Sequence, residues 1–324
     1  MRRRQFLISS GALAWSLIGH AQRSIPFIGF LNSGSPNERA HLVEAFRGGL
    51  KEGGYVDGKN LAIEYRWAEG KPDLLPKLAA ELVDRKVAVI IGTGGFLPAI
   101  AAKSATKTVP IVFVGGDDPV RLGLVNSLSH PGGNITGVLN GSVVLNRKRL
   151  EVLRDLVPGA TRIVYLSNPT STGAQASTYD VMAAAEAMRL HVEIVNASNE
   201  SEIENAFGAM KQMRADGLVV SNDTFFVSRR EQIVSLAARN AIPVSYAFRE
   251  FPMVGGLMSY GPDIRDAYSQ AGVYTARILK GAKPADLPVI QMNRIELVVN
   301  LKTAKQLGLS FPRDFLARVD EVIQ

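Results

Sequence analysis

The 324-residue chain contains no cysteine, which excludes disulfides, thiolate metal sites, catalytic thiols and a lipidated N-terminal cysteine. Histidine is almost as scarce: the chain has only His20, His41, His130 and His191, none in an HxxH or HExxH spacing. A GxSxG nucleophile elbow is also missing. These absences argue against metal or nucleophilic catalysis, so we predict no catalytic residues, no metal site and no cofactor.

Basic residues are not concentrated anywhere beyond the N-terminus. The formal net charge is +7, and the first segment contributes three of these charges through Arg2, Arg3 and Arg4, which leaves +4 for the rest. The remaining lysines and arginines are interspersed with acids, as on a solvated surface. We therefore predict no nucleic-acid partner.

The first residues have the features of an export signal. A basic segment, Met1–Arg4, precedes a mostly apolar stretch, Phe6–Ile18, and then a small-x-small site at Gly19–Ala21. The run Arg3–Leu7 also fits the twin-arginine pattern R-R-x-F-L, so Sec and twin-arginine export both stay open. No other segment is apolar over the roughly 20 residues of a membrane span. We predict cleavage near Ala21 and a mature protein in the periplasm.

A repeated order of elements indicates the fold. The apolar run Val87–Ile91 ends in a glycine-rich loop, a helix-like segment follows, and a second run, Ile111–Val114, ends in a Gly/Asp loop. Such runs are typical of strands buried on both faces in a parallel sheet flanked by helices. The same order returns in the second half, from Arg162–Leu166 onward. We predict an α/β fold of two Rossmann-like lobes with a ligand cleft between them, beyond the carboxyl ends of the strands.

The polar loops after these strands supply candidate ligand contacts. Backbone N–H groups around Gly94 begin a predicted helix and can hold an anion such as a carboxylate, although the loop also reads as a turn that simply needs glycine. Asn32 and Asn168 follow the first strand of each half, where a helix N-cap is an equal interpretation. Aromatic residues also lie near the predicted strand ends: Phe96, Phe225, Phe226, Tyr246, Phe248 and Tyr260.

Acidic residues at the strand ends are candidate partners for a ligand ammonium, because a buried ammonium must be paired. Asp117 and Asp118 are adjacent, so in an extended chain their side chains point to opposite sides. Tyr246 and Tyr260 are aromatic candidates whose hydroxyls need partners. The predicted ligand-binding residues are Asn32, Ser33, Ser35, Thr93, Gly94, Gly95, Asp117, Asp118, Asn168, Asn222, Asp223, Tyr246, Glu250 and Tyr260.

Three segments carry a resemblance to a known family. They are PGGNITG at 131–137, GLMSYGP at 256–262 and ELVVNLKTA at 296–304, and RREQIV at 229–234 is similar too. The chain resembles the ABC-transporter substrate-binding proteins of the tryptophan/tyrosine-binding type. This resemblance implies a type I periplasmic-binding-protein fold, with lobes joined by a three-crossover hinge, and a permease partner in the inner membrane.

The resemblance and the element order together predict the domains and the function. We expect a signal peptide at 1–21, one lobe from 24–137 plus 262–288, and a second lobe from 138–261 plus 289–324. The expected function is the periplasmic solute-binding component of an ABC importer, with an aromatic amino acid in the cleft. A branched-chain amino acid, an amine-free aromatic acid and a sensing module for a receptor kinase remain alternatives. An enzyme on the same scaffold, acting through Asp117 and Asp118, is a further alternative.

Overall fold

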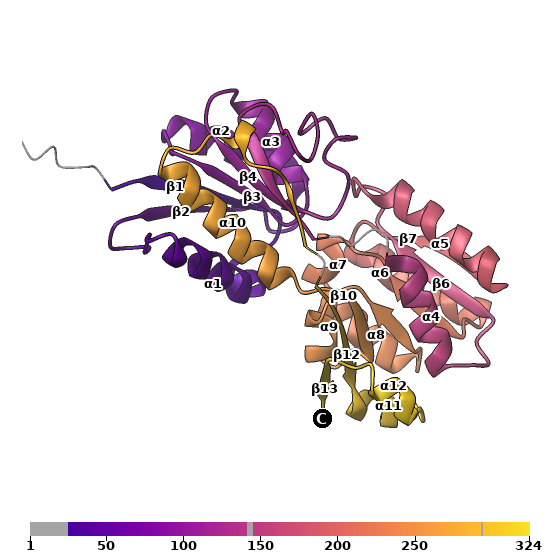
Figure 1. Cartoon of the computed structure of the whole chain (residues 1–324). Coiled ribbons are helices and arrows are strands. Elements are labelled where there is room, and N and C mark those ends of the chain that lie inside the picture. The colour runs from indigo at the N-terminus through magenta and orange to yellow at the C-terminus, as the bar shows by residue number, and fades with distance from the viewer. Residues whose placement is uncertain (1–24, 141–144, 293) are drawn as a thin grey trace, which may run out of the picture.

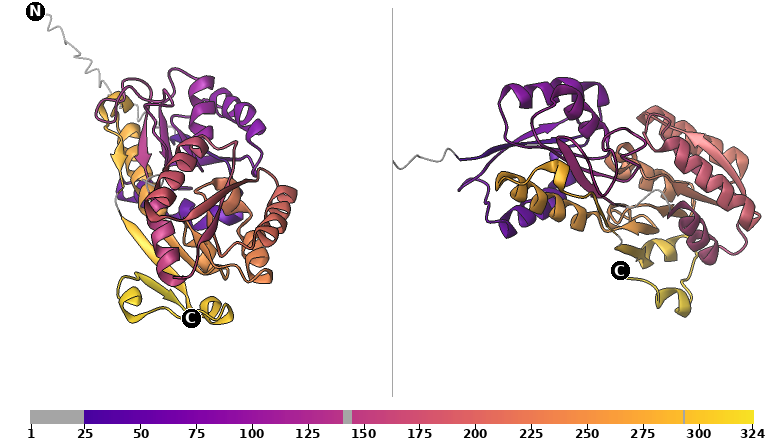
Figure 2. Two further views of the ribbon diagram at one scale, coloured as in Figure 1. Left: turned by 90° about the vertical axis from the view of Figure 1, so that its right-hand side faces the viewer. Right: turned by 45° about the horizontal axis from the view of Figure 1, so that its top comes forward.

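The computed structural model describes residues 25–140, 145–292 and 294–324, so the predicted export signal lies outside the described residues. Two lobes, each a sheet with helices on both faces, make up the described chain (Figures 1 and 2). No helix in this part of the chain is both long enough and apolar enough to cross a bilayer.

The first lobe contains a sheet of order β11-β5-β4-β3-β1-β2, in which the pairings are parallel. Its strands are β1 (Phe27–Asn32), β2 (Ala62–Trp67), β3 (Ile90–Thr93), β4 (Ile111–Gly115), β5 (Ile135–Leu139) and β11 (Ile290–Gln291). One face is covered by α1 (Pro36–Glu52) and α10 (Ile264–Leu279), which lie side by side although they are far apart in sequence (Figure 1). The other face is covered by α2 (Leu75–Asp84) and α3 (Leu97–Ala105).

The second lobe contains a sheet of order β13-β12-β10-β9-β8-β6-β7. Its strands are β6 (Arg162–Ser167), β7 (His191–Asn196), β8 (Gly217–Val220), β9 (Val244–Tyr246), β10 (Met258–Pro262), β12 (Ile295–Asn300) and β13 (Glu321–Ile323). Only the β10–β12 pairing among the described strands is antiparallel. One face packs against α4 (Asn146–Leu156), α5 (Ala174–Met188), α11 (Leu301–Gln306) and α12 (Arg313–Leu316). The other packs against α6 (Glu200–Met213), α7 (Thr224–Ser228), α8 (Arg230–Arg239) and α9 (Glu250–Met253).

Both faces of each sheet are apolar because both are covered. In β6, Val164 and Leu166 belong to the core under α6 and α8, whereas Ile163 and Tyr165 belong to the core under α4 and α5. Alternate side chains of a strand point to opposite faces, so a strand between two helical layers needs an apolar residue at every position. The continuous apolar runs of the sequence therefore become central strands, and the α/β prediction is confirmed.

One predicted strand begins later than its apolar run. The run starts at Val87, but β3 starts at Ile90. Lys86 has a positive φ of 56°, and the Val87 N–H still donates to the Leu82 carbonyl at the end of α2. The helix end therefore holds Val87, whereas Ala88 and Val89 already form hydrogen bonds with residues of β1.

The chain changes sheets at three places among the described elements. It passes from β5 to α4, from β10 to α10 and from β11 to β12, so the changes follow Leu139, Pro262 and Gln291. These positions are a few residues later than the expected boundaries at 137/138, 261/262 and 288/289. The last difference arises because β11, a two-residue strand with no sequence pattern of its own, pairs with β5. That the two lobes move as units remains our proposal.

Candidate functional site

A cleft between the two lobes is lined by the loops that follow the carboxyl ends of the central strands. In the first lobe these loops follow β1, β3 and β4, and in the second they follow β6, β8 and β9. This is where open parallel sheets place their ligands. The loop residues facing the cleft include Ser33, Gly94, Gly95, Gly116, Asp117, Asn168, Thr170–Gly173, Asn222–Thr224 and Phe248.

The lobes contact each other around this cleft. Thr224 Oγ1 in the second lobe donates to the Gly94 carbonyl in the first at 3.0 Å. An Arg121 Nη2 from the first lobe donates to the Thr172 carbonyl at 3.5 Å. The two rims of the cleft are therefore in direct contact at these two positions.

Half of the predicted ligand-binding residues line the cleft. They come from both lobes and are Ser33, Gly94, Gly95, Asp117, Asn168, Asn222 and Asp223. The hydroxyl of Ser33 is buried and has no hydrogen-bond partner among the described residues. The predicted loops therefore do converge, although their contact with a ligand remains a prediction.

Asn32 and Thr93 lie behind the cleft and position its loops. Both are fully buried, and Asn32 Nδ2 donates to Thr93 Oγ1 at 2.7 Å, while Asn32 Oδ1 accepts from the Gly34 N–H at 2.7 Å. Gly94 has a φ of +79°, and a Cβ there would lie 2.9 Å from Asn32 Oδ1. The turn therefore needs glycine, because only glycine combines this backbone conformation with such close approach.

Two predicted residues serve as caps and do not line the cleft. Ser35 is the N-cap of α1, and its N–H donates to Glu38 Oε2 at 3.4 Å, as in a capping box. Asp118 is exposed, and its Oδ1 accepts from the Val120 N–H at 2.8 Å. The adjacent Asp117 lines the cleft, so the two acids do point in different directions.

The structure does not bring the two predicted tyrosines to the cleft. Tyr246 is 0% exposed and stacks on Phe251 with ring centroids 4.3 Å apart; its hydroxyl has no partner within the described ranges, and burial raises its pKa. The chain reaches the cleft two residues later, at Phe248. Tyr260 packs against the core under α4, and its carbonyl accepts from Arg149 Nε at 2.9 Å. The prediction rested on the need of a tyrosine hydroxyl for a hydrogen-bond partner. That need does not determine whether the side chain points into the core or into the cleft.

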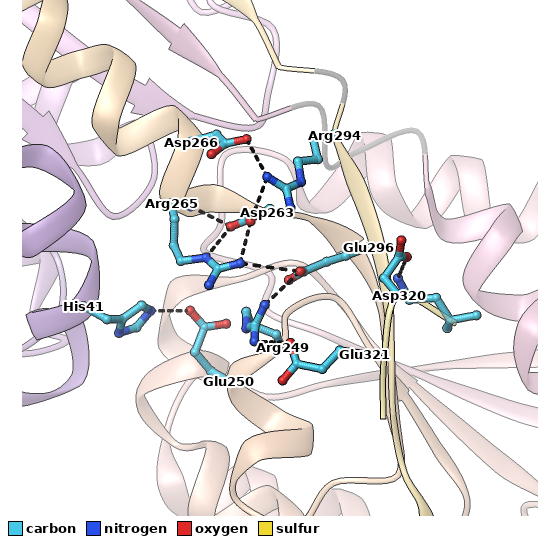
Figure 3. A network of polar contacts seen from close by, with 11 residues as sticks. His41, Arg249, Glu250, Asp263, Arg265, Asp266, Arg294, Glu296, Asp320 and Glu321 are labelled. Carbon is cyan, nitrogen blue, oxygen red and sulfur yellow. Dashed lines mark hydrogen bonds and ion pairs between the residues drawn. The ribbon is translucent and has the colours of Figure 1, made fainter. Parts of the chain in front are cut away.

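Glu250 forms a contact between the lobes and does not line the cleft. It is buried at the start of α9, and its Oε1 lies 3.0 Å from Nε2 of His41 on α1 (Figure 3). Burial by itself would raise the pKa of this carboxyl. The His41 hydrogen bond and the positive charge of Arg39 outweigh burial, so the pKa is lowered.

The two acids in the cleft already have partners. Both oxygens of Asp117 accept from Arg121, at 2.8 and 2.9 Å. Asp223 caps α7, and its Oδ1 accepts from Asn168 Nδ2 at 2.9 Å and from the Phe225 N–H at 3.0 Å. Burial raises the pKa of Asp223 and exceeds the opposing effect of these hydrogen bonds.

Arg39, which is not among the predicted residues, is the one cationic residue among the described residues that line the cleft. It lies on α1, is only 3% exposed, and lines the cleft. Its Nε and Nη2 are buried and have no hydrogen-bond partner in the described part of the chain. Helical spacing could have identified it, because Arg39 precedes Leu42, Val43 and Phe46 on the buried face of α1.

A charged network holds the crossings between the lobes (Figure 3). Asp263, the N-cap of α10, accepts from Arg265 Nε at 2.8 Å and Nη2 at 2.6 Å. Glu296 on β12 accepts from Arg249 at 2.9 Å and lies 3.8 Å from Arg265. The network therefore joins the starts of α9 and α10 to β12, at the crossings that follow β10 and β11.

Two helix-covered sheets, three crossings and a cleft at the strand ends define the type I periplasmic-binding-protein fold, and solved structures at 13 and 14% identity share this fold. The chain belongs to the ABC transporter substrate binding protein family, whose model matches residues 35–323. This is a family of solute-binding proteins, and the predicted resemblance is confirmed.

Individual relatives are similar over most of their length. A tyrosine-binding protein of Clostridioides difficile is 29% identical over 262 residues, covering 80% of this chain and 74% of the relative. A solved ABC domain from Streptococcus pneumoniae in complex with L-Trp has a TM-score of 0.85 and 28% identity, covering 93% of this chain and all of that one. A solved conserved domain protein of Vibrio cholerae has a TM-score of 0.86 and 28% identity, covering 92% of this chain and 100% of the other.

Proposed function

We propose that this protein is the periplasmic solute receptor of an ABC importer, and that it binds a small carboxylate with an aromatic or apolar body in the interlobe cleft. Binding would leave the ligand chemically unchanged and favour the closed arrangement of the lobes, which an inner-membrane permease would recognise. Export by the N-terminal signal, with cleavage near Ala21, belongs to this proposal.

The observation that carries the proposal is the guanidinium of Arg39. Its two atoms without partners, Nε and Nη2, lie on one edge of the planar group. The two oxygens of a carboxylate match such an edge and form a bidentate pair with it. Burying a charge without a hydrogen-bonded partner is costly. A carboxylate in the cleft would satisfy this donor pair.

The lining and the relatives support an aromatic or apolar body. Phe96, Phe225, Phe248 and Tyr268 contribute rings to the cleft, and Leu97, Val114, Val227 and Ile264 contribute aliphatic surface. Small-molecule sites commonly combine such walls with a few polar anchors. A relative named for tyrosine binding and a structural neighbour with bound L-Trp are consistent with this lining.

A thermal-shift screen of ligand-free mature protein tests the proposal. The panel contains aromatic and branched-chain amino acids, aromatic acids without an amine, sugars and nucleosides. A ligand at 100 times its Kd stabilises the folded state by about 2.7 kcal/mol, which is readily detected. We expect hits only among carboxylates, and we expect Arg39→Gln to weaken binding by about tenfold or more, the loss of one charged hydrogen-bonded pair.

Arg47→Gln is the matched control. Arg47 lies on the same helix, but it is exposed and pairs with Asp57 away from the cleft. Its variant should bind like the unaltered protein. Hits confined to sugars or nucleosides, or equal binding by the Arg39 and Arg47 variants, would refute a carboxylate receptor anchored by Arg39.

A further inference from the structure

We infer that the cleft selects an aromatic acid without an α-ammonium group over the amino acid with the same side chain. This inference rests on the proposed function and specifies its ligand class. It follows from the charges that face the cleft, which are Arg39, Asp117 and Asp223 among the described residues. An amino acid brings one carboxylate and one ammonium, so the cleft would need an available partner for each.

Asp117 is not available to an ammonium. The side chain of Asp117 is 8% exposed, and both of its oxygens are occupied by the same guanidinium group of Arg121. Oδ1 also accepts from the Asp118 N–H at 2.8 Å. The negative charge of Asp117 is thus paired within its own loop, and an ammonium there would compete with Arg121 Nη2, which contacts both carboxylate oxygens.

Asp223 is a poor partner for a different reason. Its Oδ1 already accepts two hydrogen bonds, from the Asn168 amide and from the Phe225 N–H at the first turn of α7. The bond to the Phe225 N–H makes Asp223 the N-cap of α7. An ammonium at Oδ1 would therefore compete with the Asn168 amide and the Phe225 N–H for one oxygen, and a displaced donor would be left unsatisfied.

Arg39 differs from these two acids because it has no hydrogen-bonded counter-ion at its Nε–Nη2 edge among the described residues. Glu250 interacts with it electrostatically, but the Oε1 of Glu250 is engaged by His41. No hydrogen bond from Nε or Nη2 of Arg39 reaches an acceptor within the described ranges. The cleft therefore presents one unsatisfied cationic edge and two anions that are already hydrogen-bonded. That arrangement complements a ligand with a carboxylate at one end and an uncharged body.

The remaining polar groups fit an uncharged body. Ser33, Thr170, Thr172 and Asn222 line the cleft beside the aromatic rings, and none of these side chains carries a charge. They can hydrogen-bond a phenol or an indole N–H, which are the polar atoms of aromatic rings. Such contacts would need no charged partner in the ligand.

Matched ligand pairs test this inference by calorimetry on ligand-free mature protein. The pairs are 3-phenylpropanoate with L-phenylalanine, 3-(4-hydroxyphenyl)propanoate with L-tyrosine, and indole-3-propionate with L-tryptophan. Each pair differs only in the α-amine. We expect the amine-free member of the best-binding pair to bind about tenfold tighter or more, since burying an ammonium without a free anion is unfavourable.

A variant that removes the partner of Asp117 provides a second test of the inference. Arg121 is half-exposed, so Arg121→Gln removes the partner of Asp117 without leaving a hole in the core. Its carboxylate would then be free to meet an ammonium, and we expect the preference for the amine-free member to fall by about fivefold or more. The ratio within a pair is the readout, because an effect on lobe closure would change both affinities alike.

The outcomes separate this inference from the function on which it rests. Tighter binding of the amino acids, with loss of binding in Arg39→Gln, would overturn the inference and leave the carboxylate receptor standing. An unchanged ratio in Arg121→Gln would also overturn it. If none of the six compounds bound, both the inference and the aromatic-carboxylate receptor would be refuted.

Discussion

Arg39 and Glu250 illustrate how the meaning of a charged residue depends on what the fold places beside it. From the sequence, Glu250 is a predicted ligand contact and Arg39 has no predicted role. In the structure both are buried, they belong to different lobes, and they interact across the interface together with His41. A charge that is expensive to bury is retained where a partner or a ligand compensates it.

The carboxylate of Glu250 predicts a pH-dependent stability. Its folded-state pKa is lowered, so its contribution is fully present above the unfolded value of about 4.3 and is lost as the pH falls through the folded value. We expect Glu250→Gln to lower the unfolding free energy by about 1–3 kcal/mol at pH 7, by analogy with other buried hydrogen-bonded charges. We expect a smaller difference at pH 3.

Urea denaturation at the two pH values measures this effect. Glu44→Gln, at an exposed position on the facing helix α1, is the control and should be close to neutral at both. A difference between Glu250→Gln and the unaltered protein that stays constant from pH 7 to pH 3 would contradict the ionic contact with His41 and Arg39.

At the scale of elements, the helices α1 and α10 show how glycine permits close packing. The two helices touch along the first lobe, and a Cβ added to Gly49 would lie 1.9 Å from the Ser269 carbonyl oxygen. A Cβ added to Gly272 would lie 2.2 Å from the Phe46 carbonyl oxygen. Backbone atoms cannot yield as the end of a side chain can, so larger residues would push the helices apart.

Gly49→Ala should therefore destabilise the protein, although alanine is the better helix former. We expect a loss of about 1–3 kcal/mol in the free energy of unfolding. Gly48→Ala is a matched control one residue earlier in the same helix, because a Cβ there meets nothing within 4 Å. That variant should gain about 0.5–1 kcal/mol from helix propensity. Equal effects of the two substitutions in chemical denaturation would refute the close approach of α1 and α10.

The polar loops at the strand ends show what can be predicted at this scale. The sequence placed Ser33, Gly94, Asp117, Asn168 and Asp223 at strand ends, and the cleft lies there. The carboxyl ends of parallel strands lie at the same edge of the sheet. Residues that follow successive strands are therefore close together, and this does not depend on the details of packing. The prediction for Tyr246 was wrong because Tyr246 still belongs to β9, where its side chain is buried, and the chain reaches the cleft only at Phe248.

At the scale of the whole molecule, hydrogen bonds from Thr224 and Arg121 join the two rims of the cleft. The Thr224 hydroxyl donates to the Gly94 carbonyl across the lobes, and the charged network of Figure 3 lies at the crossings. A contact that exists only when the lobes are close adds to ligand affinity by favouring that arrangement. Ligand and Thr224 would thus act on the same equilibrium.

Thr224→Val tests this coupling with a side chain of similar shape. Loss of the hydroxyl should weaken binding of the best ligand about two- to tenfold, the equivalent of 0.5–1.5 kcal/mol for one hydrogen bond. Small-angle scattering should show the ligand compacting the unaltered protein, and the variant should need more ligand to reach the same radius. Undiminished affinity in the variant, or no compaction in either protein, would argue against closure through this contact.

The sequence by itself determined the two-lobe α/β architecture, the family, and the edge of each sheet where a ligand would lie. It could do so because apolar runs, glycine turns and capping residues act over a few neighbouring positions, and those local signals suffice to order strands and helices. Only the tertiary structure decided which charges are satisfied. Nε and Nη2 of Arg39 have no hydrogen-bond partner among the described residues. Asp117 is paired with Arg121, and Glu250 forms a hydrogen bond with His41 of the other lobe. Compensation of a charge depends on distances between residues that are far apart in the chain, and no local pattern encodes those distances.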